Sequence, residues 1–208
     1  MNQDIPALIT YPNVVSKLFT DKELFDRELQ VYHLAPPHVP DLLSAGDAEV
    51  MDQKLYYITT KRIKGQAYLD QPNFSTTDLG AALAAFHAFT LEADKCLCHI
   101  DNQPQNILLA GSKYYFIDFS DSRRDFPEVD VTHLLLFWAE EYPFMDFIAR
   151  AGSLLNSYQQ NITLERERWS RALEQSITRF DERRAKYNKG FRRSEDSSRN
   201  RNWLSAVI

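Results

Sequence analysis

Apolar and polar positions change spacing several times along the chain, and each change predicts a new element. In the first third, apolar residues follow a strand-like run, then near-helical spacing, then a Pro-rich and polar stretch, then a β-branched and aromatic run. The elements predicted there are a strand at 12–19, a helix at 21–34 capped by Thr20 or Asp21, a connecting loop at 35–54 and a strand at 55–62.

After residue 75 the pattern becomes mainly helical. Two short apolar runs around Gly111-Ser112-Lys113 are the exception, and they indicate a β-hairpin with a tight turn. The predicted elements are a helix at 76–94, a short strand through Cys96 and Cys98, hairpin strands at 107–110 and 114–117, helical segments within 130–160 and a helix from 163 to about 187. Residues 190–208 are expected to form a polar, flexible tail.

The composition is that of a folded domain. The chain has 208 residues, 44% of them hydrophobic, and a net charge of −5, which fits one large domain or two small lobes around a cleft. No apolar run is long enough to cross a bilayer, and the first residues do not resemble a signal peptide. Cys96 and Cys98 are two residues apart on a predicted strand, so we expect them on opposite faces, and a reducing, cytoplasmic setting follows.

Polar residues suited to chemistry lie at the edges of the predicted hairpin. Asp101 and Asn106 precede its first strand, and Asp118 follows its second. Because a hairpin brings its two ends together, Asn106 and Asp118 should face one another, with Asp101 in the loop beside them. Two carboxylates and an amide oxygen are ligands that suit Mg²⁺.

This stretch resembles the protein-kinase-like superfamily, and its motif is similar to that of the aminoglycoside-phosphotransferase and RIO branch. Asp101 and Asn106 have the spacing of the catalytic loop, and Asp118-Phe119-Ser120 stands in place of Asp-Phe-Gly. Ile100 replaces a glycine of that loop. The resemblance implies an α+β, bilobal kinase-like fold with a small, trimmed β N-lobe at about 1–62 and a mainly helical C-lobe at 66–189.

Two further segments resemble nucleotide-binding parts of that family. Lys17 and Glu28 resemble the strand lysine and helix glutamate that hold the α- and β-phosphates, although alone they would read as a surface lysine and an exposed glutamate. Ile63-Lys64-Gly65 resembles the hinge, where backbone groups near Lys61 to Ile63 would meet the adenine; an ordinary strand exit explains it equally well.

The chain departs from the family pattern in two places. Only 16 residues precede Lys17 and none is glycine, so there is room for one strand at most and the Gly-rich phosphate loop is absent. Only 11 residues separate Asp118 from Asp130, which leaves no room for a long activation segment. Asp130 resembles the aspartate that holds the catalytic-loop backbone, and His87 is expected to be structural.

The resemblance implies transfer of the γ-phosphoryl group of ATP to a hydroxyl of a small molecule or a lipid-linked sugar. Asp101 would orient the hydroxyl and accept its proton, while Asn106 and Asp118 would hold Mg²⁺. Lys17, held by Glu28, would neutralise the phosphates. Two alternatives stay open: a minimal protein kinase of the RIO or tRNA-modification-complex type, whose acceptor is a protein hydroxyl, and a pseudokinase that acts as a binding module.

The C-terminal part of the chain is basic. Residues 163–208 contain twelve Lys and Arg against seven Asp and Glu, a local charge of +5, so the remainder carries −10. The excess is compatible with a nucleic-acid-binding or anion-binding helix, and also with a helix face docked on an acidic domain; the second interpretation is favoured.

Overall fold

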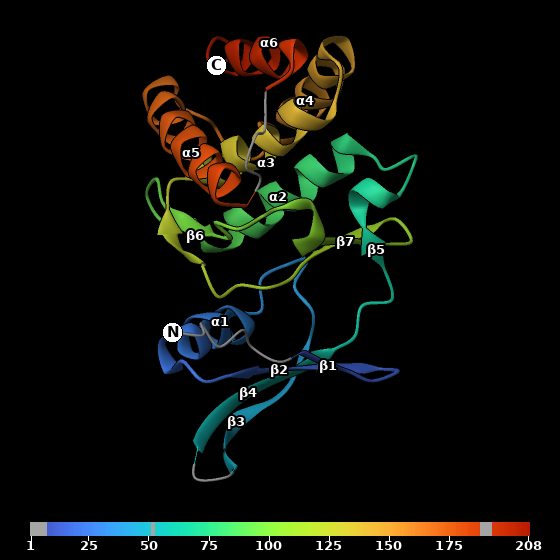
Figure 1. The fold of residues 1–208 in the computed structure, drawn as a ribbon, viewed down its shortest axis with the longest axis vertical. Coiled ribbons are helices and arrows are strands. Elements are labelled where there is room, and N and C mark those ends of the chain that lie inside the picture. The colour runs from blue at the N-terminus through green and yellow to red at the C-terminus, as the bar shows by residue number, and fades with distance from the viewer. Residues whose placement is uncertain (1–7, 51–52, 188–192) are drawn as a thin grey trace.

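The computed structural model describes residues 8–50, 53–187 and 193–208, which form two lobes (Figure 1). A four-stranded antiparallel sheet and one helix make the N-lobe, and the C-lobe is mainly helical. The chain passes between the lobes in the segment from β4 to β5. The predicted α+β, bilobal fold class is therefore confirmed.

The N-lobe sheet has the strand order β1-β2-β4-β3. Its elements are β1 (Leu8–Thr10), β2 (Val14–Phe19), α1 (Lys22–Leu34), β3 (Leu42–Val50) and β4 (Gln53–Lys61). Asp21 caps α1, since its side chain accepts hydrogen bonds from the first-turn N–H groups of Glu23 and Leu24. Phe19, Phe25 and Ile58 are buried between the helix and the sheet. This packing fixes α1 over β2 and so sets the position of Lys17.

Strand β3 was not predicted, because residues 35–54 were interpreted as a loop. Its sequence, Leu-Leu-Ser-Ala-Gly-Asp-Ala-Glu-Val, is poor in β-branched and aromatic residues. The strand forms because it pairs along its length with β4, for example Gly46 with Tyr57 and Asp47 with Tyr56. It lies at the edge of the sheet, where one neighbour supplies the backbone partners.

The C-lobe is mainly helical, and its small hairpin lies on the side that faces the N-lobe (Figure 1). Its elements are β5 (Gln66–Ala67), η1 (Tyr68–Asp70), α2 (Thr76–Thr90), β6 (Cys96–Cys98), η2 (Pro104–Asn106), β7 (Ile107–Ala110), β8 (Lys113–Phe116), β9 (Arg123–Asp125), α3 (Glu128–Glu141), α4 (Phe144–Tyr158), α5 (Arg166–Tyr187) and α6 (Glu195–Leu204). Helix α2 packs against α4, and α3 packs against α5 and α6. The predicted hairpin is present, with Ile107 opposite Phe116.

Helix α6 lies in the segment that we expected to be a flexible tail. Ser194 caps it, and it packs on α3 and α4. The buried amide of Asn200 donates to the carbonyls of Ala139 and Tyr142, and the Trp169 indole donates to the carbonyl of Leu204 at 2.7 Å. These polar groups satisfy backbone carbonyls of the C-lobe, so the polar sequence encodes a docked helix rather than a loose tail.

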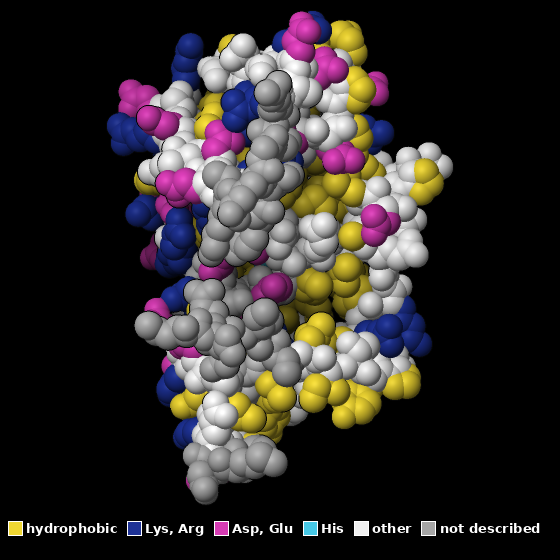
Figure 2. Space-filling model, in the orientation of Figure 1, with side chains coloured by type: hydrophobic (Ala, Val, Ile, Leu, Met, Phe, Trp, Pro, Cys, Tyr) yellow, Lys and Arg dark blue, Asp and Glu magenta, His cyan; other side chains and the backbone are white. Residues whose placement is uncertain are grey.

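The arginine-rich face of α5 lies against acidic residues of the domain. Figure 2 shows basic and acidic side chains intermingled along the edge where α5 lies. The pairs are Arg168 with Glu128, Arg179 with Asp121, Arg183 with Asp101, and Arg184 with Glu140. This is the docked arrangement favoured from the sequence. Among the described residues, no helix is long and apolar enough to span a bilayer.

The two cysteines are on β6, as predicted, but not on opposite faces. Their sulfur atoms are 3.6 Å apart, and both side chains are buried. The alternation of side chains applies to a regular pleated strand. Strand β6 has only three residues, and two positions after its end Ile100 has a φ of 69°, which takes the backbone out of the extended region.

Candidate active site

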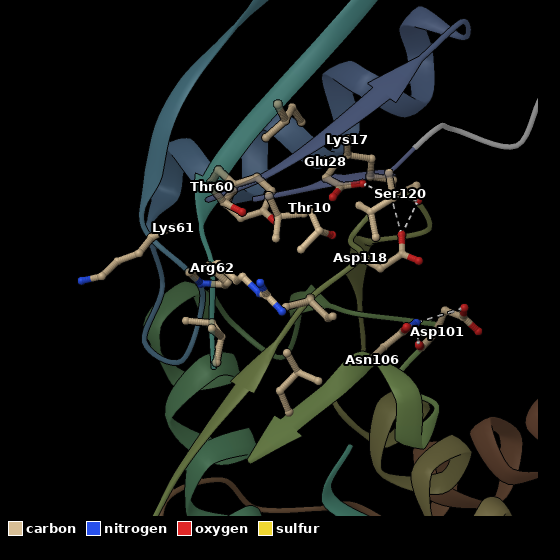
Figure 3. A pocket seen from close by; sticks show the side chains of 18 of the residues that line it. Thr10, Lys17, Glu28, Thr60, Lys61, Arg62, Asp101, Asn106, Asp118 and Ser120 are labelled. Carbon is tan, nitrogen blue, oxygen red and sulfur yellow. Dashed lines mark hydrogen bonds and ion pairs between the residues drawn. The ribbon is translucent and has the colours of Figure 1, made fainter. Parts of the chain in front are cut away.

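The site lies in a cavity of about 650 Å³ between the two lobes (Figure 3). The cavity is lined by all the candidate site residues that we identified from the sequence: Lys17, Glu28, Ile63, Asp101, Asn106 and Asp118. The predicted hairpin accounts for part of this convergence. The N–H of Ile117 donates to the carbonyl of Asn106 at 3.0 Å, which extends the β7–β8 ladder and brings Asn106 beside Asp118.

The loop that carries Asp101 is held by Asp130, which is fully buried on α3. The Asp130 carboxylate accepts hydrogen bonds from the backbone N–H of His99 at 2.6 Å and of Ile100 at 2.8 Å. Burial opposes its charge, but the hydrogen bond and charge of His87 outweigh this and lower the pKa of Asp130. The carboxylate therefore stays ionised and fixes the loop, as expected for a scaffold residue.

Two site residues have left-handed backbone conformations. Ile100 has a φ of 69° and Asp118 a φ of 67°. For a β-branched residue such as Ile100 this region is sterically unfavourable and costs on the order of 1–3 kcal/mol. The position is the one where the related loop has glycine, so Asp130 holds at Ile100 a conformation that glycine adopts freely.

Asp101 is held from both sides. Arg183 of α5 donates to its Oδ1 at 2.6 Å, and the side chain of Gln103 donates to its Oδ2 at 3.2 Å. The amide nitrogen of Asn106 donates to the carbonyl oxygen of Asp101 at 2.8 Å. The nitrogen of Asn106 is thus directed at Asp101, which leaves its oxygen as the atom that could bind a cation.

Lys17 links the two lobes across the cavity (Figure 3). Its Nζ donates to Glu28 Oε2 and to Asp118 Oδ1, each at 2.6 Å, and to the hydroxyl of Ser120 at 3.2 Å. Burial by itself lowers the pKa of this ammonium group, but the charges and hydrogen bonds of Glu28 and Asp118 outweigh it, so the pKa of Lys17 is raised. The lysine is therefore a fixed positive charge in the cavity.

The two carboxylates beside Lys17 differ in their electrostatics. Glu28 is 2% exposed, and burial raises its pKa despite the lysine. Burial also disfavours the charged form of Asp118. The charge and hydrogen bond of Lys17, together with the hydrogen bond from the Ser120 hydroxyl, outweigh this effect and lower the pKa of Asp118. Asp118 is the more strongly ionised of the two, as a cation ligand requires.

The expected hinge lies at the edge of the cavity. Ile63 lines it, while the backbone N–H groups of Lys61 and Arg62 donate to the carbonyls of Asp41 and Asn13. These two N–H groups are already bonded within the N-lobe and are not available to a ligand. Of the three hinge residues, Ile63 is therefore the one whose backbone could bind the adenine. The side chain of Lys61 points away from the cavity (Figure 3).

His87 is structural, as expected. It is fully buried, with Nδ1 2.6 Å from the Tyr158 hydroxyl and Nε2 3.0 Å from Asp130. His99 donates from Nε2 to the carbonyl of Ile117 at 2.8 Å. Both histidines therefore tie the catalytic loop to the C-lobe core.

Sequence reasoning missed the residues that cover the cavity from the N-lobe. Leu8 and Thr10 of β1 line it, as does Arg62, whose guanidinium donates to the carbonyl of Tyr11 at 3.1 Å. This short strand and the turn that leads to β2 contain no glycine. No local pattern could have pointed to Arg62, because its position depends on a contact with a residue 51 positions away.

The donor set fits a magnesium ion. Asp118 supplies a carboxylate and Asn106 an amide oxygen, and Mg²⁺ binds through one or two carboxylates, waters and substrate phosphates. Lys17 beside Asp118 adds the positive charge that suits a polyphosphate at the same place.

Comparisons with known proteins agree with this geometry. The model of the phosphotransferase enzyme family matches residues 90–170, which include the catalytic loop and the hairpin. No curated protein matches the chain in sequence. The expected resemblance to the aminoglycoside-phosphotransferase branch is thereby confirmed.

Several solved structures share the fold. An amicoumacin kinase, solved with AMP-PNP, Ca²⁺ and Ami, is 11% identical, with a TM-score of 0.66 over 100% of this chain and 90% of that chain. A microcompartment-associated aminopropanol kinase is 11% identical, with a TM-score of 0.60 over 98% and 90%. Aminoglycoside phosphotransferase APH(3'')-Id from Streptomyces rimosus, in complex with ADP and streptomycin, is 15% identical, with a TM-score of 0.59 over 80% and 87%.

Proposed function

We propose that the chain is an ATP-dependent kinase that transfers a γ-phosphoryl group to a hydroxyl of a small molecule. The observation that carries this proposal is the convergence of Lys17, Asp101, Asn106 and Asp118 in one cavity between the lobes. The family match over residues 90–170 and the shared fold with kinases bound to AMP-PNP or ADP support it. A cytoplasmic setting, in which the two buried cysteines stay reduced, belongs to the same proposal.

In this mechanism Asp101 orients the acceptor hydroxyl and takes its proton as the oxygen attacks the γ-phosphorus. Lys17 binds the phosphates, and Glu28 holds the lysine in place at 2.6 Å. Asn106 and Asp118 would hold Mg²⁺, which when bound neutralises charge on the phosphates. Backbone groups at Ile63 would meet the adenine. Catalysis is then mainly positioning and charge stabilisation.

The test of the nucleotide site is thermal unfolding with and without Mg²⁺–ATP. A ligand that binds only the folded state raises the Tm, and the rise grows with the logarithm of the ligand concentration relative to its Kd. We expect a Mg²⁺-dependent rise in the wild type that is largely lost in Asp118→Asn, whose Tm without ligand serves as the control for folding. No rise in the wild type at saturating nucleotide would favour the pseudokinase alternative.

The test of catalysis is the Asp101→Asn variant. We expect it to keep the Mg²⁺–ATP shift and to lose phosphate transfer, because the hydroxyl then has no proton acceptor. Full activity in Asp101→Asn would rule out Asp101 as the base. Transfer to the chain itself or to a protein, with no transfer to small hydroxyl compounds, would favour the minimal protein kinase.

A further inference from the structure

A second cavity, of about 520 Å³, adjoins the nucleotide cleft on the side of α5. Its lining residues are Arg27, Ile100, Asp121, Arg123 and Arg179. Asp121 also lines the first cavity, so the two are neighbours. Nothing in the mechanism described above uses this second cavity.

Three arginines from three different elements converge on it. Arg27 comes from α1, Arg123 from β9 and Arg179 from α5, and their side chains are 33%, 52% and 33% exposed. Asp121 is the single carboxylate among the lining residues, and it is paired with Arg179 at 3.0 Å. Arg27 and Arg123 are paired with Glu23 and Asp125, which lie outside the lining. Among the lining residues themselves, guanidinium groups that solvent can reach therefore outnumber carboxylates.

The arginines are held in place and still have donors to offer. Arg27 donates to the carbonyl of Ser120 at 3.0 Å and to Glu23, and Arg179 donates to the carbonyl of Ile100 at 3.3 Å and to Asp121. Each of these contacts uses one N–H, and a guanidinium has five. Fixed guanidinium groups of this kind suit the planar, bidentate recognition of a phosphate or a carboxylate.

The cavity lies beside the proposed base. Ile100, which lines it, immediately precedes Asp101. Arg183, one turn after Arg179 on α5, contacts Asp101 at 2.6 Å and Asp121 at 3.7 Å. An anion bound among these arginines would place the rest of its molecule next to Asp101.

We propose that this arginine cavity binds an anionic group of the acceptor, so that the substrate is a hydroxyl compound carrying a phosphate or a carboxylate. This inference rests on the proposed kinase function. The acceptor oxygen forms a bond to the γ-phosphorus, the bond from that phosphorus to the β,γ-bridging oxygen breaks, ADP leaves with the bond's electron pair, and the hydroxyl proton goes to Asp101.

The first test measures binding of inorganic phosphate by isothermal titration calorimetry, at constant ionic strength and without nucleotide. We expect Arg123→Gln and Arg179→Gln each to weaken binding at least about tenfold, because each removes a charged hydrogen-bond donor. Arg171→Gln, on the exposed side of α5, is the matched control and should stay within about twofold.

The Lys17→Met variant distinguishes phosphate bound in the arginine cavity from phosphate bound in the nucleotide cleft. Phosphate bound among the arginines persists in Lys17→Met, whereas phosphate bound in the cleft is lost. Absence of phosphate binding in the wild type, loss of binding in Lys17→Met, or an equal loss in Arg171→Gln and Arg179→Gln would each overturn the arginine site. None of these results depends on ATP binding, so a failure of the arginine site would leave the kinase proposal untouched.

The second test compares ADP release with matched acceptors: glucose, glucose 6-phosphate, gluconate and kanamycin. We expect turnover with an anionic acceptor to exceed turnover with glucose and kanamycin at least about tenfold, and Arg123→Gln to remove this difference mainly through KM. The pair of anionic acceptors distinguishes a phosphate from a carboxylate. Turnover that favours glucose or kanamycin would overturn the proposal while supporting the kinase itself.

Discussion

The ammonium group of Lys17, in the N-lobe, donates a 2.6 Å hydrogen bond to Oδ1 of Asp118, in the C-lobe. The same nitrogen donates to Glu28 on α1 at 2.6 Å. The lysine thus pairs with two carboxylates that come from separate lobes. Its removal has consequences both for the fold and for the site.

We expect Lys17→Met to lower the free energy of unfolding by about 3 kcal/mol at pH 8, because it leaves the buried Glu28 carboxylate without its partner. Burial raises the pKa of Glu28 above its ordinary value of 4.5, so the folded variant takes up a proton more readily than the unfolded chain. Stability of the variant therefore recovers as the pH falls, and the loss should be smaller at pH 5. Urea unfolding at the two pH values measures this.

The control is Lys17→Met combined with Glu28→Gln. The double variant has no buried charge to compensate, so most of the stability returns while binding of Mg²⁺–ATP stays lost. If the double variant were as unstable as Lys17→Met, the loss would come from packing and not from the unpaired carboxylate.

The sequence predicted the parts of the site that depend on local spacing. Asp101, Asn106 and Asp118 are brought together by one loop and one hairpin, and both are readable from nearby residues. The contacts of Lys17 with Asp118 and of Arg183 with Asp101 join residues 101 and 82 positions apart. Such contacts depend on how the lobes and helices pack, and no local pattern encodes them.

The same reason explains the two misinterpreted segments. Strand β3 has little strand propensity of its own and forms through pairing with β4. Helix α6 is polar, and its stability comes from contacts that Asn200 and Arg201 make with α3 and α5. In both cases the partner element decides the structure.

A second prediction concerns Asp130 and the strained loop. Asp130→Asn presents an NH₂ group to one of the N–H donors of His99 and Ile100, so a buried donor loses its acceptor. We expect a loss of about 3 kcal/mol in the free energy of unfolding and a loss of phosphate transfer larger than any loss of nucleotide binding. Chemical denaturation and ADP release measure the two effects.

Asp47→Asn is the matched control for this substitution, since its carboxylate pairs with Lys54 on the surface of the N-lobe. It should cost less than about 1 kcal/mol and leave activity unchanged. A similar loss of stability in both variants would contradict the scaffold role of Asp130.

A third prediction concerns the docking of α6. Arg201 is 7% exposed in its side chain and bridges Glu140 of α3, at 2.7 Å, and Asp181 of α5, at 2.9 Å. Arg201→Met should lower the free energy of unfolding by about 2 kcal/mol, since Arg184 and Arg193 also contact these carboxylates and limit the loss. Arg199 is 53% exposed and its guanidinium lies over the ring of Phe144 on α4, so Arg199→Met should cost less than about 1 kcal/mol. Equal effects would show that α6 is not held by the Arg201 bridge.

The last prediction uses His133, which is buried on α3 beside the catalytic loop. Its Nδ1 donates to Asn102 Oδ1 at 2.9 Å, and Asn102 in turn donates to the carbonyl of Asp130 at 2.7 Å. Burial, with the charges of Arg179 and Arg183, lowers the pKa of His133 to about 4, although Asp101 and Asp130 oppose the shift. The histidine is therefore neutral in the folded protein at pH 7.

Because the pKa of His133 is about 4 in the folded protein and near 6.5 in the unfolded chain, the unfolded chain binds the proton more tightly between these values. Stability from this group is fully present above pH 6.5 and is lost as the pH falls toward 4. Between pH 7 and pH 5 we expect the wild type to lose about 2 kcal/mol that His133→Gln does not lose, since glutamine does not titrate. Urea unfolding of both proteins at the two pH values measures the difference, and equal pH dependence would mean that the pKa of His133 is the same in the folded and unfolded chain.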